Sequence, residues 1–239
     1  MLRMRLTLLK CQGECYPSRR PVNLDRQAVV RTALRVLNKT GLDGLTVRKI
    51  ASELRVQAPA LYWHFKNKQE LLDEMATTVH ADFVREQGVP GENLSWSEMA
   101  SEHVHALRQT LLRYRDGARM FSGRYLTDSS LYASMEAALA KFTEAGFSLP
   151  DAASVLNTLY CYVIGFTIEE QAVFPRQGKR SKQYNPARRS KRIDPNKFPL
   201  SLAAGPEAFA QFDERFARGV ELILSGVQTK PQDGKTTDP

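Results

Sequence analysis

Apolar residues recur at helical spacing along most of the chain, and no stretch shows sustained alternation of apolar and polar positions. The first apolar stripe predicts a helix that follows Asp25, a good N-cap residue, and ends at Gly41. Thr46 can cap a second, short helix, and Pro59 suits the first turn of a third helix about two turns long. The pattern therefore predicts an all-α protein.

A longer fourth helix is expected after Asn67, because Asn67 and Glu70 have the spacing of a capping box. The turn-rich segment QGVPGEN at 87–93 then interrupts the pattern and gives our predicted domain boundary. Ser95 and Glu98 form a second capping box, which predicts another helix directly behind the boundary.

The C-terminal half is expected to contain three more long helices, at about 128–144, 148–174 and 206–227. A stripe of phenylalanine and aliphatic side chains marks the last of them, which is predicted to start at Pro206. Residues 175–199 hold four prolines and almost no hydrophobic periodicity, so we expect a mobile basic loop there.

The net charge of +8 is distributed unevenly along the chain. Residues 1–20 carry five basic side chains and one acidic one, and residues 21–80 carry nine and six. Residues 176–199 carry nine basic side chains against Asp194 alone, whereas the rest of the chain is net acidic. A basic front and an acidic body are typical of a protein whose N-terminal part meets a polyanion.

Composition excludes several classes of protein. With 42% hydrophobic residues, no long apolar run and no signal-peptide core, the chain is expected to be globular and cytoplasmic. Three cysteines argue against a disulfide framework, and Cys161 is expected in the core because it falls in an apolar run. Cys11 and Cys15 lack partners at ligand spacing, so we expect neither a metal site nor a cofactor.

The second and third helices, joined by residues 55–57, have the proportions of a helix-turn-helix. In this motif the start of the second helix contacts base edges in the major groove, and hydroxyl or basic side chains bind phosphates. Small residues there permit close approach to the bases. The predicted DNA contacts are Thr46, Arg48, Ala58, Pro59, Ala60, Tyr62, Trp63, His64, Lys66 and Lys68.

Four consecutive large side chains from Tyr62 to Phe65 cannot all face one side of a helix, because neighbours are about 100° apart. Leu61 and Phe65 lie four residues apart and are expected in the core. The three residues between them are then expected on the DNA side. From the sequence, Trp63 could also serve a contact between helices, and His64 could be a packed imidazole.

The stretch LTVRKIASELRVQAPALYWHFKNKQELLDEMA closely resembles the DNA-binding half of the tetracycline-repressor (TetR) family. The segments LLRYRDGARMF, EAGFSL and VIGFTIEEQ extend the resemblance weakly into the C-terminal half, over 24–174 and 206–228 in all. Members of this family are all-helical homodimers that bind a palindromic operator. A small molecule bound in the C-terminal half releases them from the DNA.

The resemblance implies a ligand-responsive transcriptional repressor that is not an enzyme, and that controls an antibiotic export or resistance gene. Together with the helix pattern it predicts five regions. They are a disordered basic tail at 1–20, the helix-turn-helix domain at 21–86, the helical ligand-binding and dimerisation domain at 94–228, its mobile loop at 175–199, and a disordered tail at 229–239.

The resemblance also places a ligand site. Glu169 matches a glutamate of the tetracycline-binding members, His103 takes the place of their asparagine, and their two histidine positions fall at Phe121 and near Val84. Phenylalanine cannot bind a metal, so a magnesium chelate is not the expected ligand. A small hydrophobic or aromatic effector is expected instead. The implied pocket residues are His103, Leu107, Phe121, Leu156, Asn157, Tyr160 and Glu169.

Other interpretations remain open from the sequence. The chain could be a DNA-binding regulator without a small-molecule inducer, controlled by a partner protein. The basic loop could be an extra DNA arm, although a solvated loop over the pocket mouth is favoured. An enzyme built on Cys161, His103 and Glu169 is disfavoured, because no glycine-rich turn, oxyanion feature or nucleotide fingerprint accompanies them.

Overall fold

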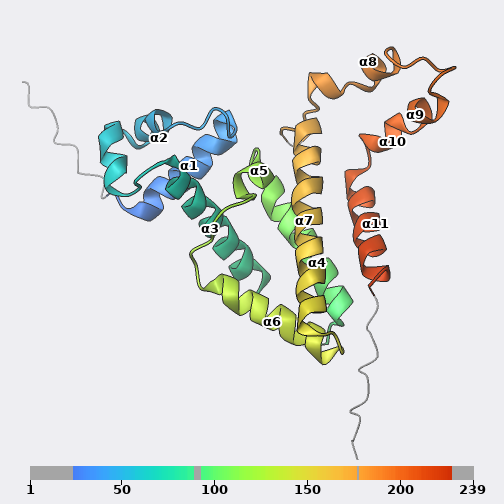
Figure 1. Cartoon of the computed structure of the whole chain (residues 1–239). Coiled ribbons are helices and arrows are strands. Elements are labelled where there is room, and N and C mark those ends of the chain that lie inside the picture. Colours follow the sequence, from blue (N-terminus) through green and yellow to red (C-terminus); the bar gives the residue numbers. More distant parts are fainter. Residues whose placement is uncertain (1–23, 89–92, 177, 228–239) are drawn as a thin grey trace, which may run out of the picture.

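The computed structural model describes residues 24–88, 93–176 and 178–227, which form helices and no β-strand, as the sequence predicts (Figure 1). Both predicted terminal tails, at 1–20 and 229–239, lie outside the described residues. The helices are α1 (Arg26–Thr40), α2 (Val47–Leu54), the 3₁₀ helix η1 (Ala58–Trp63), α3 (Lys68–Gln87), α4 (Trp96–Leu112), α5 (Gly117–Phe121), α6 (Ser130–Glu144), α7 (Leu149–Val173), the 3₁₀ helix η2 (Lys182–Tyr184), α8 (Pro186–Ser190), α9 (Pro199–Ala203), α10 (Gly205–Ala208) and α11 (Phe212–Ser225).

The predicted caps at Asp25, Thr46 and Ser95 are confirmed. The side chains of Asp25 and Thr46 accept hydrogen bonds from backbone N–H groups in the first turns of α1 and α2, and Ser148 does the same for α7. At the start of α4, Ser95 and Glu98 form a complete capping box, in which each side chain bonds the other residue's backbone. These local contacts set the helix starts that the sequence predicts.

The third helix is about two turns long, as expected, and it is a 3₁₀ helix of six residues whose last turn closes with a bond from His64 N to Leu61 O. The capping box of α3 is only half present. Asn67 Oδ1 accepts from Glu70 N at 2.8 Å, but the Glu70 carboxylate accepts from Lys66 N instead of Asn67 N.

The last helix also starts later than predicted. Residues 205–208 form the separate helix α10, and α11 begins only at Phe212. Between them Gln211 has a φ of 50°, in the left-handed region, which stops the helix from running through. The phenylalanine stripe continues across this break, so periodicity alone could not reveal it.

Residues 175–199, for which a mobile basic loop is predicted, contain the short helices η2 and α8 in their described part. The segment packs against α9 and α10, away from α2 and η1 (Figure 1). Arg180 donates to Phe209 O at 2.9 Å and lies 4.7 Å from the ring centre of Phe174. Arg189 donates to Ser201 O at 3.1 Å. These arginines therefore hold the segment to its own C-terminal neighbours.

The long helix α7 packs on α4, α5, α6 and α11, and part of its surface stays exposed. Cys161 lies on this exposed part, so the expectation that it is a core residue is wrong. Of the helices in the described residues, α7 alone is long and apolar enough to cross a membrane, a test that core helices also pass.

The N-terminal head consists of residues 24–67 and the start of α3, and we call the rest of the molecule the body (Figure 1). The helix α3 runs from the head into the body. The end of α1 contacts the segment after α7, where Arg176 donates to Lys39 O at 3.0 Å. The turn after α1 contacts the segment before α5, where Asp116 Oδ2 accepts from Leu42 N at 2.9 Å. Gly41 in this turn has a φ of 75°, and an added Cβ would lie 2.7 Å from Asp116 Oδ2. Only glycine suits both the conformation and the close approach.

Candidate functional site

The residues predicted to contact DNA lie on neighbouring elements of the head. Trp63 is 89% exposed and Tyr62 is 57% exposed, so the outward direction expected for this pair is observed. The other fully exposed members are Thr46, Arg48, Pro59, Lys66 and Lys68, and the half-buried members are Ala58, Ala60 and His64. The structure thus collects all ten on the surface of α2, η1 and the start of α3. Their contact with DNA stays a prediction.

Leu61 and Phe65 are buried beneath this surface, as predicted from their spacing. The turn between α2 and η1 is also fixed, because Arg55 N–H bonds to Ser52 O and Val56 N–H bonds to Ala51 O. This pair of bonds is a Schellman-type helix end, for which Arg55 takes the left-handed conformation at a φ of 59°. The angle between the two elements is therefore set by both backbone bonds and core packing.

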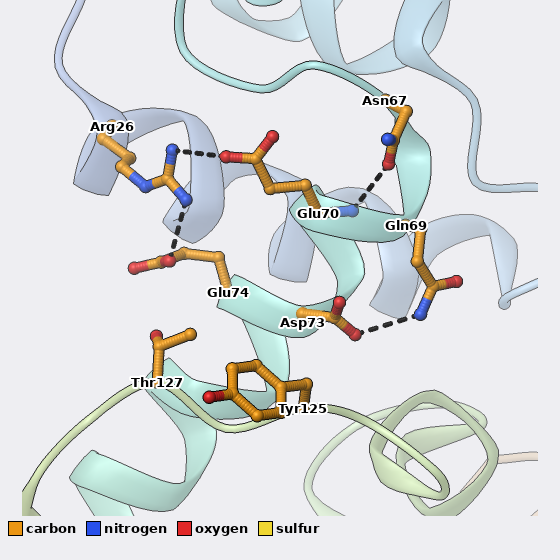
Figure 2. Close-up of a pocket in the computed structure, with 8 residues that line it drawn as sticks. All are labelled: Arg26, Asn67, Gln69, Glu70, Asp73, Glu74, Tyr125 and Thr127. Carbon is orange, nitrogen blue, oxygen red and sulfur yellow. Dashed lines mark hydrogen bonds and ion pairs between the residues drawn. The ribbon is translucent and has the colours of Figure 1, made fainter.

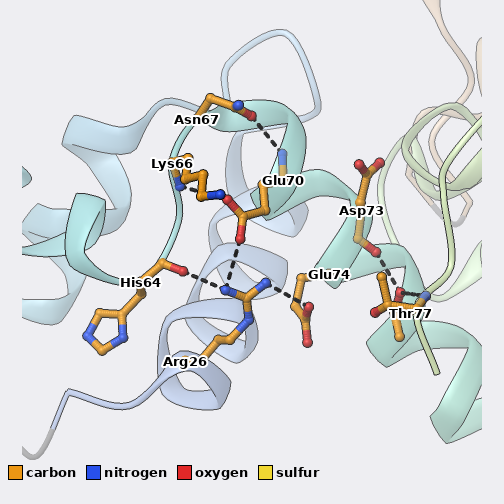
Figure 3. Close-up of polar contacts among 9 residues, drawn as sticks. Arg26, His64, Lys66, Asn67, Glu70, Asp73, Glu74 and Thr77 are labelled. Carbon is orange, nitrogen blue, oxygen red and sulfur yellow. Dashed lines mark hydrogen bonds and ion pairs between the residues drawn. The ribbon is translucent and has the colours of Figure 1, made fainter.

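Arg26 connects three elements of the head through one side chain (Figure 3). Its guanidinium donates to the carbonyl oxygen of His64 at 2.5 Å and to the carboxylates of Glu70 and Glu74 at 3.1 and 3.0 Å. It also lies 4.4 Å from the ring centre of Phe65. Burial alone would lower the pKa of Arg26, but the bonds to Glu74 and Glu70 raise it. Arg26 is thus a charged clamp that holds the end of η1 to α1 and α3.

A groove of about 240 Å³ lies beside this clamp (Figure 2). Its far wall is the segment between α5 and α6, which contributes Tyr125 and Thr127. The backbone N–H of Thr127 donates to Thr77 Oγ1 on α3 at 3.1 Å. The segment between α5 and α6 therefore contacts α3, the helix that connects the head to the body.

A second cluster, of two imidazole and two phenyl rings, joins α3, α4 and α5 inside the body. The rings of His80 and Phe121 are stacked at 25° with centres 6.5 Å apart, and Phe83 lies 6.1 Å from His80. Phe83 in turn meets His103 edge-on at 5.0 Å. Two predicted ligand residues, His103 and Phe121, are thus brought together by His80 and Phe83. We call these four residues the imidazole cluster.

The pKa values of both histidines of the imidazole cluster lie below the ordinary value, which favours their neutral form. Burial lowers the pKa of His80, and the nearby charge of Asp128 only partly opposes this effect. Burial also lowers the pKa of His103, and the proximity of His80 lowers it further. His103 nevertheless keeps exposed surface, so solvent reaches the cluster from the α4 side. His105, two residues away, instead bonds Ser101 O through Nδ1 and packs on α11.

The other predicted ligand residues are more dispersed. Leu107 is buried one turn beyond His103, and Leu156 is half-buried on α7. Asn157, Tyr160 and Glu169 are exposed on α7. Glu169 lines a different groove, of about 230 Å³, between α7 and the segment that includes α11. A shared pocket for all seven residues therefore stays a prediction.

The buried carboxylate of this region is Glu170, the neighbour of the residue that the sequence singled out. Arg108, only 2% exposed, donates to both oxygens of Glu170, at 2.8 and 2.7 Å, and contacts Asp213 at 2.7 Å. Burial alone would lower the pKa of Arg108, but these carboxylates raise it. The three residues form an ion triad that joins α4, α7 and α11. Its arginine lies 5.0 Å from the ring centre of Phe216.

Two residues that stand out in the structure, His80 and Glu170, are not among the residues predicted from the sequence. A signal for His80 was present, because it lies three residues before Phe83 and beside Val79 on the predicted apolar stripe of α3. A polar ring on such a stripe is either hydrogen-bonded in the core or functional. No comparable signal separates Glu170 from Glu169, since both are charged residues in an apolar run.

Comparison with known proteins supports this division into head and body. The family model for the tetR family of bacterial regulatory proteins matches residues 29–75, and that for the tetracycline-repressor-like C-terminal domain matches residues 89–230. The class A tetracycline repressor from transposon 1721 of Escherichia coli is 37% identical over 208 residues, which cover 85% of this chain and 90% of the repressor.

Solved structures agree with the sequence relatives. A possible TetR family regulator from Streptomyces coelicolor A3(2) superposes with a TM-score of 0.74 at 34% identity, covering 84% of this chain and 98% of the other. ActR from Streptomyces coelicolor, solved in complex with actinorhodin, gives a TM-score of 0.71 at 26% identity, with 85% and 96% covered. With both family models matched in order, the chain belongs to the TetR family of bacterial transcriptional repressors, which are DNA-binding regulators and not enzymes.

Proposed function

We propose that this protein is a cytoplasmic repressor that binds a palindromic operator as a homodimer, and that a small hydrophobic or aromatic molecule releases it. The observation that carries the proposal is the contrast between exposed and buried side chains within the head. Exposed Tyr62 and Trp63 and two exposed lysines sit on a rigid base of Leu61 and Phe65. The small side chains at the start of η1 suit close approach to bases in the major groove, and the lysines that follow η1 suit the phosphates.

Homodimerisation is supported by the exposed part of α7 and by α11. Leu149 and Leu222 are 58% and 65% exposed, and Tyr160 is exposed as well. Large apolar side chains on neighbouring helices are typical of a surface that pairs with another protein surface. In a two-fold pair the same patch serves both subunits, and a palindromic operator repeats that symmetry.

Coupling between ligand and operator is supported by the position of the imidazole cluster. A ligand that contacts His80 bears on α3, which carries the head, and one that contacts Phe121 bears on α5, whose leading segment holds Leu42 through Asp116. If ligand and operator favour different arrangements of these helices, each must weaken the binding of the other. This reciprocity is the basis of the proposed release.

An aromatic effector is supported by the rings of the imidazole cluster and by the absence of a metal-binding side chain at Phe121. ActR, a structural relative, has been solved in complex with actinorhodin. By analogy we propose that this chain controls an antibiotic export or resistance gene. Expression of a reporter from the promoter of such a gene, measured with and without the effector, would test this control.

Lys68→Ala is expected to weaken operator binding by roughly 1–3 kcal/mol, because a phosphate contact is lost from the exposed start of α3. The slope of log K against log salt should also fall by about 1, which a loss of folding would not produce. Binding of a duplex selected from a random library, followed by fluorescence anisotropy at several salt concentrations, measures both quantities.

Lys197→Ala is the matched control for this experiment, because Lys197 is also exposed but lies in the basic segment near α9. We expect its operator affinity and salt slope to equal those of the wild type. Equal losses in both variants would support the basic segment as a DNA arm. An unchanged Lys68→Ala protein would contradict the proposed DNA surface.

Arg26→Ala is expected to weaken operator binding about fivefold to tenfold without altering effector affinity, because the end of η1 loses its clamp to α3. Arg35→Ala removes the same charge from the same helix, where Arg35 is exposed and bonds only Thr32 in the described contacts. If both variants lose affinity equally, net charge rather than the clamp is responsible.

A further inference from the structure

One buried polar atom of the imidazole cluster has no partner. His80 is 8% exposed, and its Nδ1 has no hydrogen-bond partner in the part of the chain that the structure describes. A buried polar atom without a partner costs about 1–3 kcal/mol, and most such atoms in proteins are satisfied. An apolar residue at this position would avoid the cost. An unpaired polar atom in such a position is therefore expected where the side chain binds a ligand.

Among the described residues, the buried polar side chains of the body other than His80 and Arg115 have partners for their buried atoms. Gln171 accepts from Ala118 N at 3.1 Å and donates to Tyr114 O at 2.8 Å. Arg108 is bonded to two carboxylates. Arg115 Nε is the other unpartnered buried atom, but the same guanidinium donates to Lys39 O through Nη1. Only the His80 atom sits among aromatic rings.

We propose that His80 Nδ1 is the hydrogen-bond anchor for a hydroxyl group on a neutral, planar aromatic effector that packs against Phe83 and Phe121. This inference rests on the proposed ligand site and names the chemistry that the site selects. It adds His80 as a specificity-determining residue, since the hydroxyl distinguishes the effector from a bare hydrocarbon of the same shape.

A hydroxyl group fits the anchor better than other polar groups. In a neutral imidazole, Nδ1 is a donor in one tautomer and an acceptor in the other. A hydroxyl can both donate and accept, so it satisfies either tautomer, whereas a carbonyl satisfies only one. The atom is therefore paired by a hydroxyl whichever nitrogen carries the proton.

The surroundings favour a neutral and aromatic molecule. Phe83, Phe121 and the buried Leu107 supply apolar contacts, and the lowered pKa of both imidazoles favours their neutral form. Arg108 and Glu170, on α4 and α7, neutralise each other. The negative charge of Asp128 acts on His80, so an anionic effector would be repelled in addition to losing its hydration.

The test compares 2-naphthol with naphthalene, which differ only in one hydroxyl group, on the full-length protein at pH 7.5. Titration calorimetry, supported by thermal shift, is expected to show 2-naphthol binding about 10-fold or more tighter than naphthalene. In His80→Phe, which keeps an aromatic ring but no nitrogen, this preference should vanish. In His80→Asn, whose amide can donate and accept near the same place, part of it should return.

His105→Phe is the matched control, because it removes an imidazole from the same region whose Nδ1 already bonds Ser101 O. It should keep the preference for 2-naphthol. His80→Phe should fold at least as stably as the wild type, since it deletes an unpaired buried atom; His80→Asn serves if it does not. Equal affinities of the wild type for both probes, no binding of either probe, or an undiminished preference in His80→Phe would each overturn the inference.

The proposed function is tested by a different measurement. Operator binding and its release are followed by anisotropy of labelled DNA with the same proteins. If 2-naphthol binds through His80 but no aromatic hydroxyl compound changes operator affinity, ligand-released repression is wrong and the anchor stands. If operator release occurs equally in wild type and His80→Phe, release stands and the anchor is wrong.

Discussion

Glu170→Ala is expected to lower the free energy of unfolding by about 3 kcal/mol, because it leaves the buried guanidinium of Arg108 without its bidentate partner. Removal of one member of a buried ion pair typically costs about 3–5 kcal/mol. The lower end applies here because Asp213, whose side chain is 86% exposed, still contacts Arg108 from the solvent side. Urea denaturation at one fixed protein concentration measures the change, since a dimer's stability depends on concentration.

Two comparisons make this expectation specific. Glu169→Ala removes the same charge one residue earlier on the exposed side of α7, and should change stability by less than about 0.5 kcal/mol. The double variant Arg108→Met with Glu170→Leu should recover much of the lost stability, because apolar replacements remove both buried charges. Equal effects of Glu169→Ala and Glu170→Ala would show that the triad does not hold α4 to α7.

Phe65→Ala is expected to cost about 3–5 kcal/mol and to abolish operator binding, although Phe65 is only 4% exposed and is not itself expected to contact DNA. The ring is buried beneath the exposed side chains of η1, and the guanidinium of Arg26 lies over its face. Its loss leaves a cavity between the surface that carries Tyr62 and the start of α3. Urea denaturation and operator anisotropy on the same preparation give the two values.

Trp63→Ala provides the contrast, because Trp63 is two residues away and almost fully exposed. Its stability should stay within about 0.5 kcal/mol of the wild type while operator affinity falls. Should Trp63→Ala destabilise the protein as much as Phe65→Ala, Trp63 would be a packing residue, the alternative that the sequence leaves open.

The parts of the fold that were predicted correctly depend on neighbouring residues in the chain. Asp25, Thr46 and Ser95 cap helices through bonds to N–H groups within three residues, so a short sequence window contains the whole interaction. The burial of Leu61 and Phe65 also follows from local geometry, since residues four apart share a helix face.

The parts that could not be predicted depend on contacts between distant segments. Glu170 is buried because Arg108, 62 residues earlier, faces it, and this fact is absent from the sequence around Glu170. His80 is distinctive because none of the residues that the structure describes bonds its Nδ1, and this is visible only in three dimensions. The start of α11 was misplaced because hydrophobic spacing continues through Gln211, whose backbone conformation ends the continuity.

The contacts between the end of α1 and the body have a mechanical consequence for the head. Asp116 holds Leu42 N, and Arg115 and Arg176 hold Lys39 O, while α3 enters the body separately. A displacement of α3 and a displacement of α5 therefore reach the head through different points of attachment. In a symmetric pair, a displacement of both heads changes the spacing between them, the quantity that the pitch of the double helix measures.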